Sequence, residues 1–365
     1  MYKNIIMYKN IIMSKLLQTI LFCAVAIVAM SVAAKASDIP DVNATVILSF
    51  PLEYNGKTYG NPAISDIGPD GKLYVGLAGN ILNPFVDTPK GIFRYGSSFS
   101  PELVIELPGF GGFIEKLWFS NDGYLYVCLA NYYIPNGIVS NGVIRVDIVT
   151  KTYIQIWASD GIIVFPAGLG EDSQGRLYIS DPILGLVVQI DKSGNVLNIL
   201  DDPKCKGTAV PTPTGCNGLA VTTKNQNDNY LYTPNFDQST IVRVSINNVT
   251  GAFGSPEIVY ADPSIVTFDQ LSADPSEHYL FSAGFGTGIV GRINIKNKNK
   301  IRVTTLTQSA DGLGFTVQAL PSDGFEDSDL DGSLFVNNLD PFVPGGGSIW
   351  LLKPECDNPG SCSFY

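Results

Sequence analysis

The sequence predicts an all-β protein, a six-bladed β-propeller with four-stranded antiparallel blades. Three observations support this. The chain holds 37 Gly and 23 Pro in 365 residues, which favours short strands and turns over long helices. A turn followed by Leu-Tyr-Val, or a close variant, recurs six times. A strand that the last repeat lacks is found near the start of the chain. Apolar residues at 45% are enough for a large core.

The repeat has a long period, which is typical of propellers and other repeat folds. Its aromatic ring recurs every 49 to 54 residues, at Tyr74, Tyr126, Tyr178, Tyr232, Phe281 and Phe335. Each unit reads as four strands: an apolar segment before the turn, Leu-Tyr-Val, a third segment such as Gly142–Asp147 and a fourth such as Tyr153–Trp157. Alternating apolar positions and β-branched residues support strands throughout.

The two ends of the repeat complement each other. The sixth unit stops after its third strand, Ser348–Leu352, and the missing fourth strand matches Thr45–Phe50. Pairing these segments closes the ring and removes the open edges of a linear array. We therefore expect one propeller over 45–353, with a short lead at 37–44; an open β-solenoid is the alternative.

The first 36 residues are typical of a secretory signal peptide. Lys15 precedes an apolar stretch, Thr19–Ala34, and Ala34-Lys-Ala36 forms a small-residue cleavage site. An uncleaved anchor is the alternative, but this stretch is short for the roughly 20 apolar residues that a membrane span needs. We expect cleavage after Ala36, a secreted protein and no membrane attachment afterwards.

Secretion permits disulfide bonds. Short loops close most easily, so we expect Cys205 to pair with Cys216, and Cys356 with Cys362 in a tail at 354–365. Cys128 lies in a strand pattern and is expected to be a buried small apolar residue rather than a reactive thiol.

Two sequons, Asn43-Ala-Thr45 and Asn248-Val-Thr250, predict N-glycosylation at Asn43 and Asn248 in a host that glycosylates.

Charge narrows the class of partner. Residues 1–36 hold four of the 23 basic residues and no acidic residue, so the rest of the chain has a net charge of about −15. That charge argues against nucleic acid or an anionic membrane as partner, since both need a basic face. The lone histidine, His278, argues against a histidine-rich zinc site or a histidine-based triad. We expect a monomer that acts on a small molecule.

A candidate site follows from the architecture. The first strand of each blade lines the central channel, and aligning these strands brings six positions to one mouth of it: Pro62, Glu115, Ala167, Asn217, Asp269 and Thr316. Glu115, Asn217 and Asp269 supply oxygen ligands, which suit a divalent cation, calcium first and zinc second. Alternatively, Asn217 caps a turn and the carboxylates pair with a lysine such as Lys116 or with water.

A second acidic segment, Asp327–Gly332, matches the start of a calcium-binding loop. Its twelfth position is Asn338 rather than the bidentate Glu, and the segment runs directly into a strand. A solvated hairpin is the alternative interpretation, and the turn is expected on the opposite face from the channel mouth.

The sequence resembles the regucalcin–gluconolactonase family of six-bladed propellers and, more loosely, paraoxonases, strictosidine synthases and NHL-repeat proteins. The resemblance covers almost all of 45–353. It rests on the Leu-Tyr-Val turns and on these segments: Cys216-Asn-Gly-Leu-Ala-Val221, Phe268-Asp-Gln-Leu-Ser-Ala-Asp274, Ile241-Val-Arg-Val244, Pro256-Glu-Ile-Val259 and Gly345-Gly-Gly-Ser-Ile-Trp350.

The resemblance implies a metal-binding role for Asn217, and a metal-binding and catalytic role for Asp269. The family's blade-one Glu, in an E-G-P segment, is absent here, where the chain reads Gly60-Asn-Pro62. We expect Glu115 to replace it from the next blade, as metal ligand and catalytic carboxylate, or Asn61 to approach the ion.

These observations favour a secreted, metal-dependent hydrolase of lactones or related esters. Asn235 and Asp181, at the ends of second strands, are expected to orient the groups that hold the ion. The alternative is a non-catalytic, secreted binding propeller that has lost part of its metal site.

Overall fold

The structure, a computed structural model, describes residues 42–77, 89–107, 113–130, 141–159, 161–209, 213–224, 229–261, 268–284, 290–295, 302–307, 316–339 and 347–354. The predicted signal peptide and the cysteines Cys356 and Cys362 lie outside these ranges. Within them the elements are β-strands and two short 3-10 helices, η2 (Pro203–Cys205) and η3 (Ser328–Leu330). None of the helices in this part of the chain is long and apolar enough to cross a membrane.

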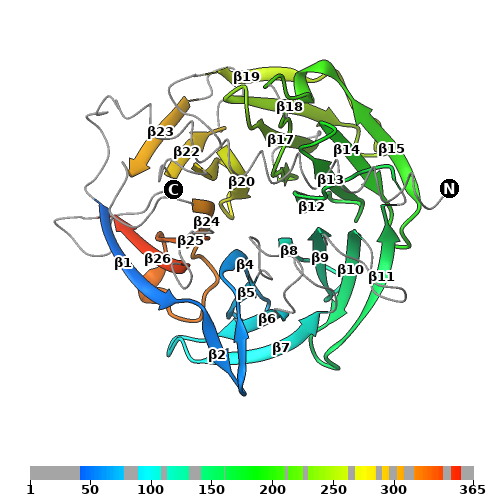
Figure 1. The fold of residues 1–365 in the computed structure, drawn as a ribbon. Coiled ribbons are helices and arrows are strands. Elements are labelled where there is room, and N and C mark those ends of the chain that lie inside the picture. Colours follow the sequence, from blue (N-terminus) through cyan, green and yellow to red (C-terminus); the bar gives the residue numbers. More distant parts are fainter. Residues whose placement is uncertain are drawn as a thin grey trace.

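Six four-stranded antiparallel sheets surround a central axis, which confirms the predicted six-bladed propeller (Figure 1). The blades, in chain order and from the inner to the outer strand, are β4 (Pro62–Ile67), β5 (Leu73–Leu77), β6 (Lys90–Tyr95) and β7 (Pro101–Leu107); β8 (Phe113–Phe119), β9 (Leu125–Ala130), β10 (Gly142–Asp147) and β11 (Thr152–Ala158); β12 (Leu169–Glu171), β13 (Leu177–Asp181), β14 (Leu186–Ile190) and β15 (Val196–Asp201); β16 (Ala220–Thr222), β17 (Asn229–Asn235), β18 (Thr240–Ile246) and β19 (Glu257–Ala261); β20 (Phe268–Ala273), β21 (Tyr279–Gly284), β22 (Val290–Asn294) and β23 (Arg302–Thr307); β24 (Thr316–Pro321), β25 (Leu334–Asn338), β26 (Ser348–Pro354) and β1 (Val42–Ser49).

The sixth blade is built from both ends of the chain, as predicted. Strand β1 pairs antiparallel with β26, with Val42 opposite Pro354 and Ser49 opposite Ser348. In Figure 1 the two strands, blue and red, lie side by side. The closing strand begins at Val42, earlier than the predicted Thr45. This pairing completes the sixth blade to four strands and closes the ring, which leaves only the short edges of the individual blades.

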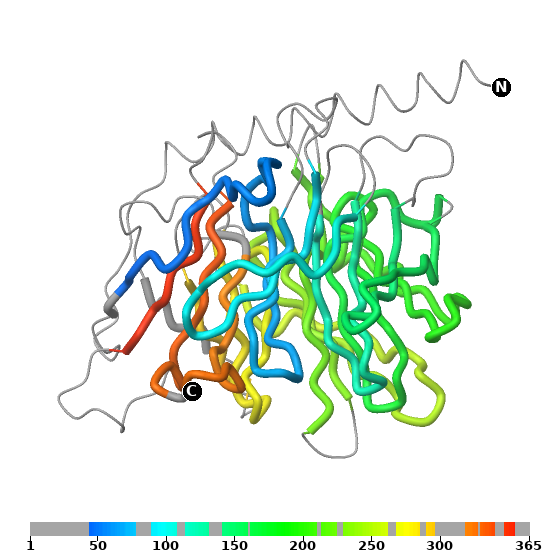
Figure 2. Tube along the Cα trace, turned by 90° about the horizontal axis from the view of Figure 1, so that it is seen from below, coloured from blue at the N-terminus to red at the C-terminus, as the bar shows by residue number. Residues whose placement is uncertain are grey.

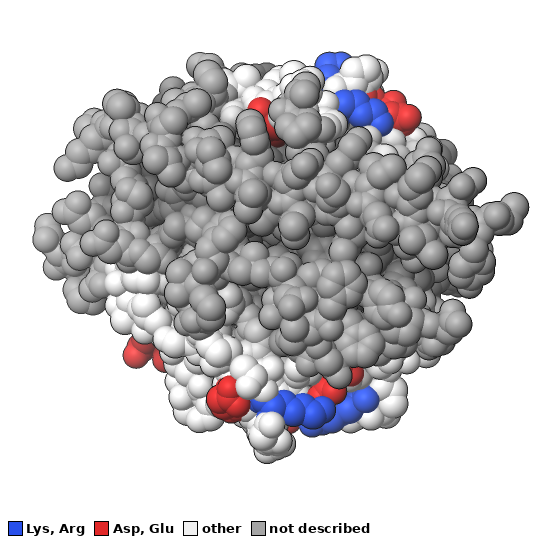
Figure 3. All heavy atoms as spheres, in the orientation of Figure 1, with Lys and Arg blue, Asp and Glu red and all other residues white. Residues whose placement is uncertain are grey.

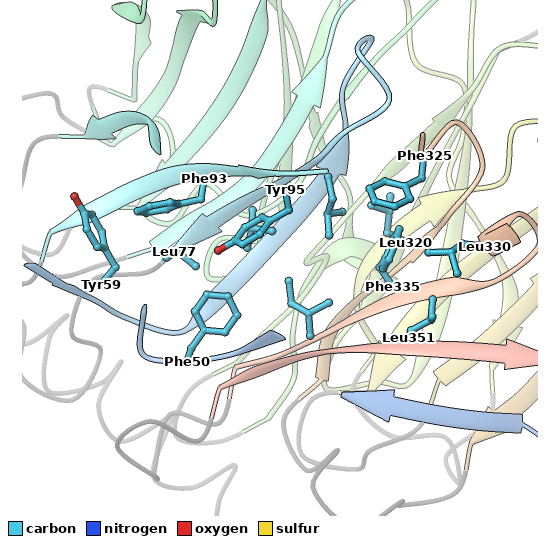
Figure 4. Close-up of a cluster of buried hydrophobic side chains, with 13 residues drawn as sticks. Phe50, Tyr59, Leu77, Phe93, Tyr95, Leu320, Phe325, Leu330, Phe335 and Leu351 are labelled. Carbon is cyan, nitrogen blue, oxygen red and sulfur yellow. The ribbon is translucent and has the colours of Figure 1, made fainter. Parts of the chain in front are cut away.

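A hydrophobic cluster secures the closure between blades six and one (Figure 4). Phe335 of blade six is fully buried and meets Phe325 edge-on, with ring centroids 5.3 Å apart. Tyr59 comes from a short hairpin, β2 (Leu52–Tyr54) and β3 (Lys57–Tyr59), and packs edge-on against Phe93 of blade one. Blade one is thereby packed against the segment that follows β1.

The repeated aromatic residue lies on the second strand of each blade and is buried in all six. In blades one to three its hydroxyl donates to an aspartate of the preceding turn: Tyr74 to Asp70, Tyr126 to Asp122, and Tyr178 to Asp172. The turns between first and second strands lie along one side of the wheel (Figure 2). The repeat therefore combines a core side chain with a turn clasp.

Candidate functional site

The first strands carry a β-bulge at corresponding places in four blades. The extra residues are Ala63 in β4, Glu115 in β8, Asp269 and Gln270 in β20, and Val317 in β24. A bulge turns an additional side chain out of the regular ladder and is frequent beside functional sites. Here the bulged residues lie on the innermost strands, at the channel.

Counting from the repeated ring through the strand register gives one equivalent position per blade: Ala63, Glu115, Ala167, Asn217, Asp269 and Val317. The prediction agrees for blades two to five. It was one residue early for blades one and six, where it named Pro62 and Thr316.

Asn217 and Asp269 contact each other directly. The Asn217 Nδ2 donates a 2.6 Å hydrogen bond to Oδ1 of Asp269, and the amide of Gly218 donates to the Asp269 carbonyl at 3.2 Å. The backbone of Asn217 is held by its N–H to Pro234 O at 2.9 Å and by a bond from the Ser180 hydroxyl to its carbonyl. Side chains 52 residues apart in sequence are thus brought together and locked in place.

Glu115 approaches the same place from blade two, which lies across the ring from blade five (Figure 1). Burial raises the pKa of Asp269 to about 7, although the bond from Asn217 and the charge of Lys116 oppose the shift. Burial, followed by the charge of Asp269, raises the pKa of Glu115 well above its ordinary value. Two carboxyl groups therefore share a partly buried site.

This donor set fits a hard divalent cation. It consists of two carboxyl groups and one amide, and a cation would offset the cost of burying both negative charges. The group is small, since no cluster of three or more His, Cys, Asp or Glu in the described ranges can hold a metal. Blade one contributes Ala63 rather than a carboxylate, and Asn61 lies beside Gly347 of blade six instead.

Lys116 crosses the channel below Glu115. Its side chain is 5% exposed, and Nζ donates to the carbonyl of Leu271 in blade five at 3.4 Å. Burial lowers its pKa to about 8, against the charges of Asp66 and Asp269. The alternative prediction was an ion pair between Lys116 and the carboxylates of the site. None of the ion pairs found among the described residues joins Lys116 to Glu115 or Asp269.

Asp66 was not predicted, although one signal was available: a carboxylate inside the apolar first strand of blade one. Burial raises its pKa to about 6, opposed by Lys116 and by the amides of Phe119 and Ile67. Asp66 lies on an inner strand, whereas the charged side chains of described residues that are visible in Figure 3 lie near the edge of that face.

Asn235 and Asp181 serve the neighbouring loops. Asn235 Nδ2 donates to the carbonyls of Lys204 and Lys206, at 3.0 and 2.8 Å. The Asp181 carboxylate accepts hydrogen bonds from four backbone N–H groups, those of Val164, Phe165, Ile183 and Leu184. Among the described residues, no hydrogen bond from either side chain to Asn217 or Asp269 is found, so the expected orienting role stays a prediction.

The cysteines are partly as predicted. Cys128 is fully buried, and burial raises the pKa of its thiol well above the ordinary value, as expected of a small core residue. Cys205 and Cys216 are buried side by side, linked by a 2.9 Å bond from Cys216 N to Cys205 O. The structure contains them as free thiols, so their disulfide stays a prediction.

The remaining candidates lie away from Asn217 and Asp269, on β1, in a turn of blade four and in the acidic turn of blade six. Asn43 is on β1 opposite Lys353, and Asn248 accepts a bond from Asn229 N at 2.9 Å; glycosylation of both stays a prediction. In the acidic turn, Asp327 Oδ1 accepts the amide of Asp329 at 3.1 Å, and the described residues there form no metal-holding cluster.

Comparison with known proteins places the fold. No family model and no curated protein matches the chain. Among solved structures, an auxiliary nutrient binding protein from Bacteroides ovatus matches 87% of this chain and 78% of its own, with a TM-score of 0.58 and 10% identity. A putative oxidoreductase (glucose dehydrogenase) from Thermus thermophilus matches 86% and 100%, with a TM-score of 0.53 and 12% identity.

A third structure is a catalytically inactive virginiamycin B lyase from Staphylococcus aureus with quinupristin. It matches 86% of this chain and 99% of its own, at a TM-score of 0.50 and 12% identity. The chain is a six-bladed β-propeller. At such identities the likeness establishes the fold alone, and its bearers range from enzymes to binding proteins, so function must be argued from the site.

Proposed function

We propose that this propeller is a secreted hydrolase of lactones or related esters that uses a divalent cation, calcium in the first place, held by Asn217, Asp269 and Glu115. The observation that carries the proposal is the 2.6 Å contact between Asn217 and Asp269 with Glu115 beside them. A polar trio at equivalent positions of three blades is costly to bury and has no role in the core. The resemblance to the regucalcin–gluconolactonase family supports the same site.

The protein side chains have distinct parts in this reaction. When bound, the cation supplies Lewis-acid polarisation of the ester carbonyl. Asp269 is the carboxylate that would take a proton from the attacking water. Glu115, the other carboxylate of the site, would help to hold the cation, and the proton taken up by Asp269 would pass to the departing alkoxide oxygen. Water adds to the carbonyl, the ring C–O bond breaks, and a hydroxy acid results.

The test is an assay of the mature protein on a panel of lactones and simple esters, with calcium and with chelator. We expect hydrolysis that chelator abolishes and that Asp269→Asn lowers by about 10²-fold or more. Asp201→Asn, which changes an exposed outer-strand carboxylate, is the matched control. Equal turnover by the wild type and Asp269→Asn would exclude the mechanism.

A non-catalytic binding propeller is the second candidate. It is favoured by blade one, where the chain reads Gly60-Asn-Pro62 and lacks the Glu of the family that it resembles. The nutrient binding protein among the similar structures shows that this fold serves such proteins too. Calorimetry decides between the two: calcium binding without turnover of any lactone or ester supports binding alone.

A further inference from the structure

A cavity of about 220 Å³ lies in the half of the channel nearer the turns between first and second strands, which we call the lower half. Its walls come from the inner strands of blades one, two, four, five and six, and from the turns of blades four and five. Apolar residues dominate the wall, namely Leu219, Val221, Leu271 and Leu320. Because drug-sized ligands need cavities of ~300 Å³ or more, only a smaller molecule fits here.

Two charged side chains in this cavity have unused bonding capacity. Lys116 is 5% exposed, and its three ammonium hydrogens have one acceptor among the described residues, Leu271 O at the long distance of 3.4 Å. Asp66 accepts one backbone N–H on each oxygen, from Ile67 at 3.0 Å and Phe119 at 3.2 Å. A carboxylate can accept about four bonds, so half of its capacity is open.

The other charged residues of the cavity are already engaged. Glu277 accepts the amides of Thr223 and Lys224, at 2.6 and 2.5 Å. Asp274 accepts the amides of Ser276 and Tyr279. Lys224 donates to the carbonyl of Pro275 at 2.7 Å, and its side chain is exposed, so water can take up its remaining hydrogens. Lys116 and Asp66 are therefore the groups that remain for a ligand.

The two groups have opposite charges but form no ion pair within 4 Å in the described structure. Each is nevertheless felt by the other, since Lys116 lowers the pKa of Asp66. A gap between a buried ammonium and a half-buried carboxylate, walled by aliphatic residues, is complementary to a molecule with both charges and an aliphatic part.

We propose that the lower cavity binds a small zwitterion of the α-amino acid class with an aliphatic side chain. Its carboxylate accepts from Lys116 Nζ, its ammonium donates to the Asp66 carboxylate, and its side chain packs against Leu219, Val221 and Leu271. This supplies hydrogen bonds that both protein groups lack and adds no net charge to the cavity. The proposal does not depend on the hydrolase activity at the other end of the channel.

Calorimetry on the mature wild-type protein, with chelator present so that the upper site holds no cation, tests the proposal. L-Valine is the probe, and N-acetyl-L-valine and L-valinamide each lack one of its charges. We expect valine to bind at millimolar concentrations and each blocked compound to bind about tenfold or more weakly. Absence of binding by valine, alanine and leucine would overturn the proposal, as would equal binding of N-acetylvaline, which would indicate a site for carboxylates only.

Variants assign the residues. Lys116→Met keeps the aliphatic stem and Asp66→Asn keeps the shape, and each is expected to weaken valine binding about tenfold or more. Lys204→Met and Asp201→Asn, exposed residues of blade three, are the matched controls and should bind as the wild type. Circular dichroism confirms folding. Wild-type affinity in both folded cavity variants would contradict the proposal, and the blocked ligands test it without any variant.

Discussion

The side-chain nitrogen of Asn217 lies 2.6 Å from Oδ1 of Asp269, so one hydrogen bond joins the inner strands of blades four and five at the channel. Both residues hold the same place in the repeat, as does Glu115 in blade two. The ring geometry thus converts three separate sequence positions into one site. Whether this site holds a cation is open to direct measurement.

Asn217→Leu should weaken calcium binding by about tenfold or more, because the substitution removes an oxygen ligand and leaves Asp269 without its amide partner. Titration calorimetry of the metal-free protein measures the change. Asn198→Ala, on the outer strand of blade three, is the control and should bind calcium as the wild type. Unchanged affinity in Asn217→Leu would show that the amide takes no part in holding the ion.

Asp66 should make the folded protein less stable as pH rises. Its pKa of about 6 in the folded state lies above the ordinary 3.8, so its contribution is fully present below about pH 4 and is lost as pH rises through 6. Lys116 is the charged group that affects it in this structure. One pKa unit corresponds to about 1.4 kcal/mol, so the loss is at most about 3 kcal/mol.

Urea unfolding of the wild type and Asp66→Asn at acidic and neutral pH isolates this contribution. From acidic to neutral pH, the free energy of unfolding of the variant should rise relative to that of the wild type, since an amide does not ionise. A constant difference between the two proteins would show that Asp66 titrates normally in the folded state. Asp201→Asn, an exposed site, should show no such trend.

Much of this architecture was predictable because it repeats. A six-fold turn and an aromatic residue at each copy reveal the blades, and the unmatched strand at each end reveals the closure. The hairpin β2–β3 was missed, although Asn55-Gly56 is a strong hairpin signal; both residues have positive φ, at 49° and 73°. A single hairpin outside the repeat gains no support from the other copies.

The candidate site was predictable only in part. Asn217, Asp269 and Glu115 were found by aligning the repeats, because each is a polar residue at the aligned position of its blade. Asp66 and the contact of Lys116 across the channel were not found. They depend on the position of each first strand along the channel axis. Strand depth is set by packing between blades, and local periodicity does not encode it.

Tyr178→Phe should cost about 1–2 kcal/mol of stability. Its hydroxyl donates to Asp172 at 2.7 Å and accepts from Gln189 at 2.6 Å, so the substitution leaves two buried groups short of a partner. Urea unfolding measures the loss, and Tyr153→Phe, on the outer strand β11, is the control. No difference between the two variants would show that the hydrogen bonds of the Tyr178 hydroxyl add nothing to stability.

Blade five tolerates Phe281 at the equivalent position because Asp274 accepts hydrogen bonds from the amides of Ser276 and Tyr279 in its own turn.

Oxidised, secreted protein should contain a bond between Cys205 and Cys216. The two thiols are buried side by side, and the bond closes a short loop of the kind that stabilises by about 2–3 kcal/mol. Alkylation of the unfolded, unreduced protein, followed by mass spectrometry of its peptides, measures the state of each cysteine. Cys128, buried in blade two, is the internal control and should alkylate without reductant. If Cys205 and Cys216 also alkylate fully, they are structural thiols, and hydrogen bonds from side chains such as Asn235 and Asp237 then hold the loop before Asn217.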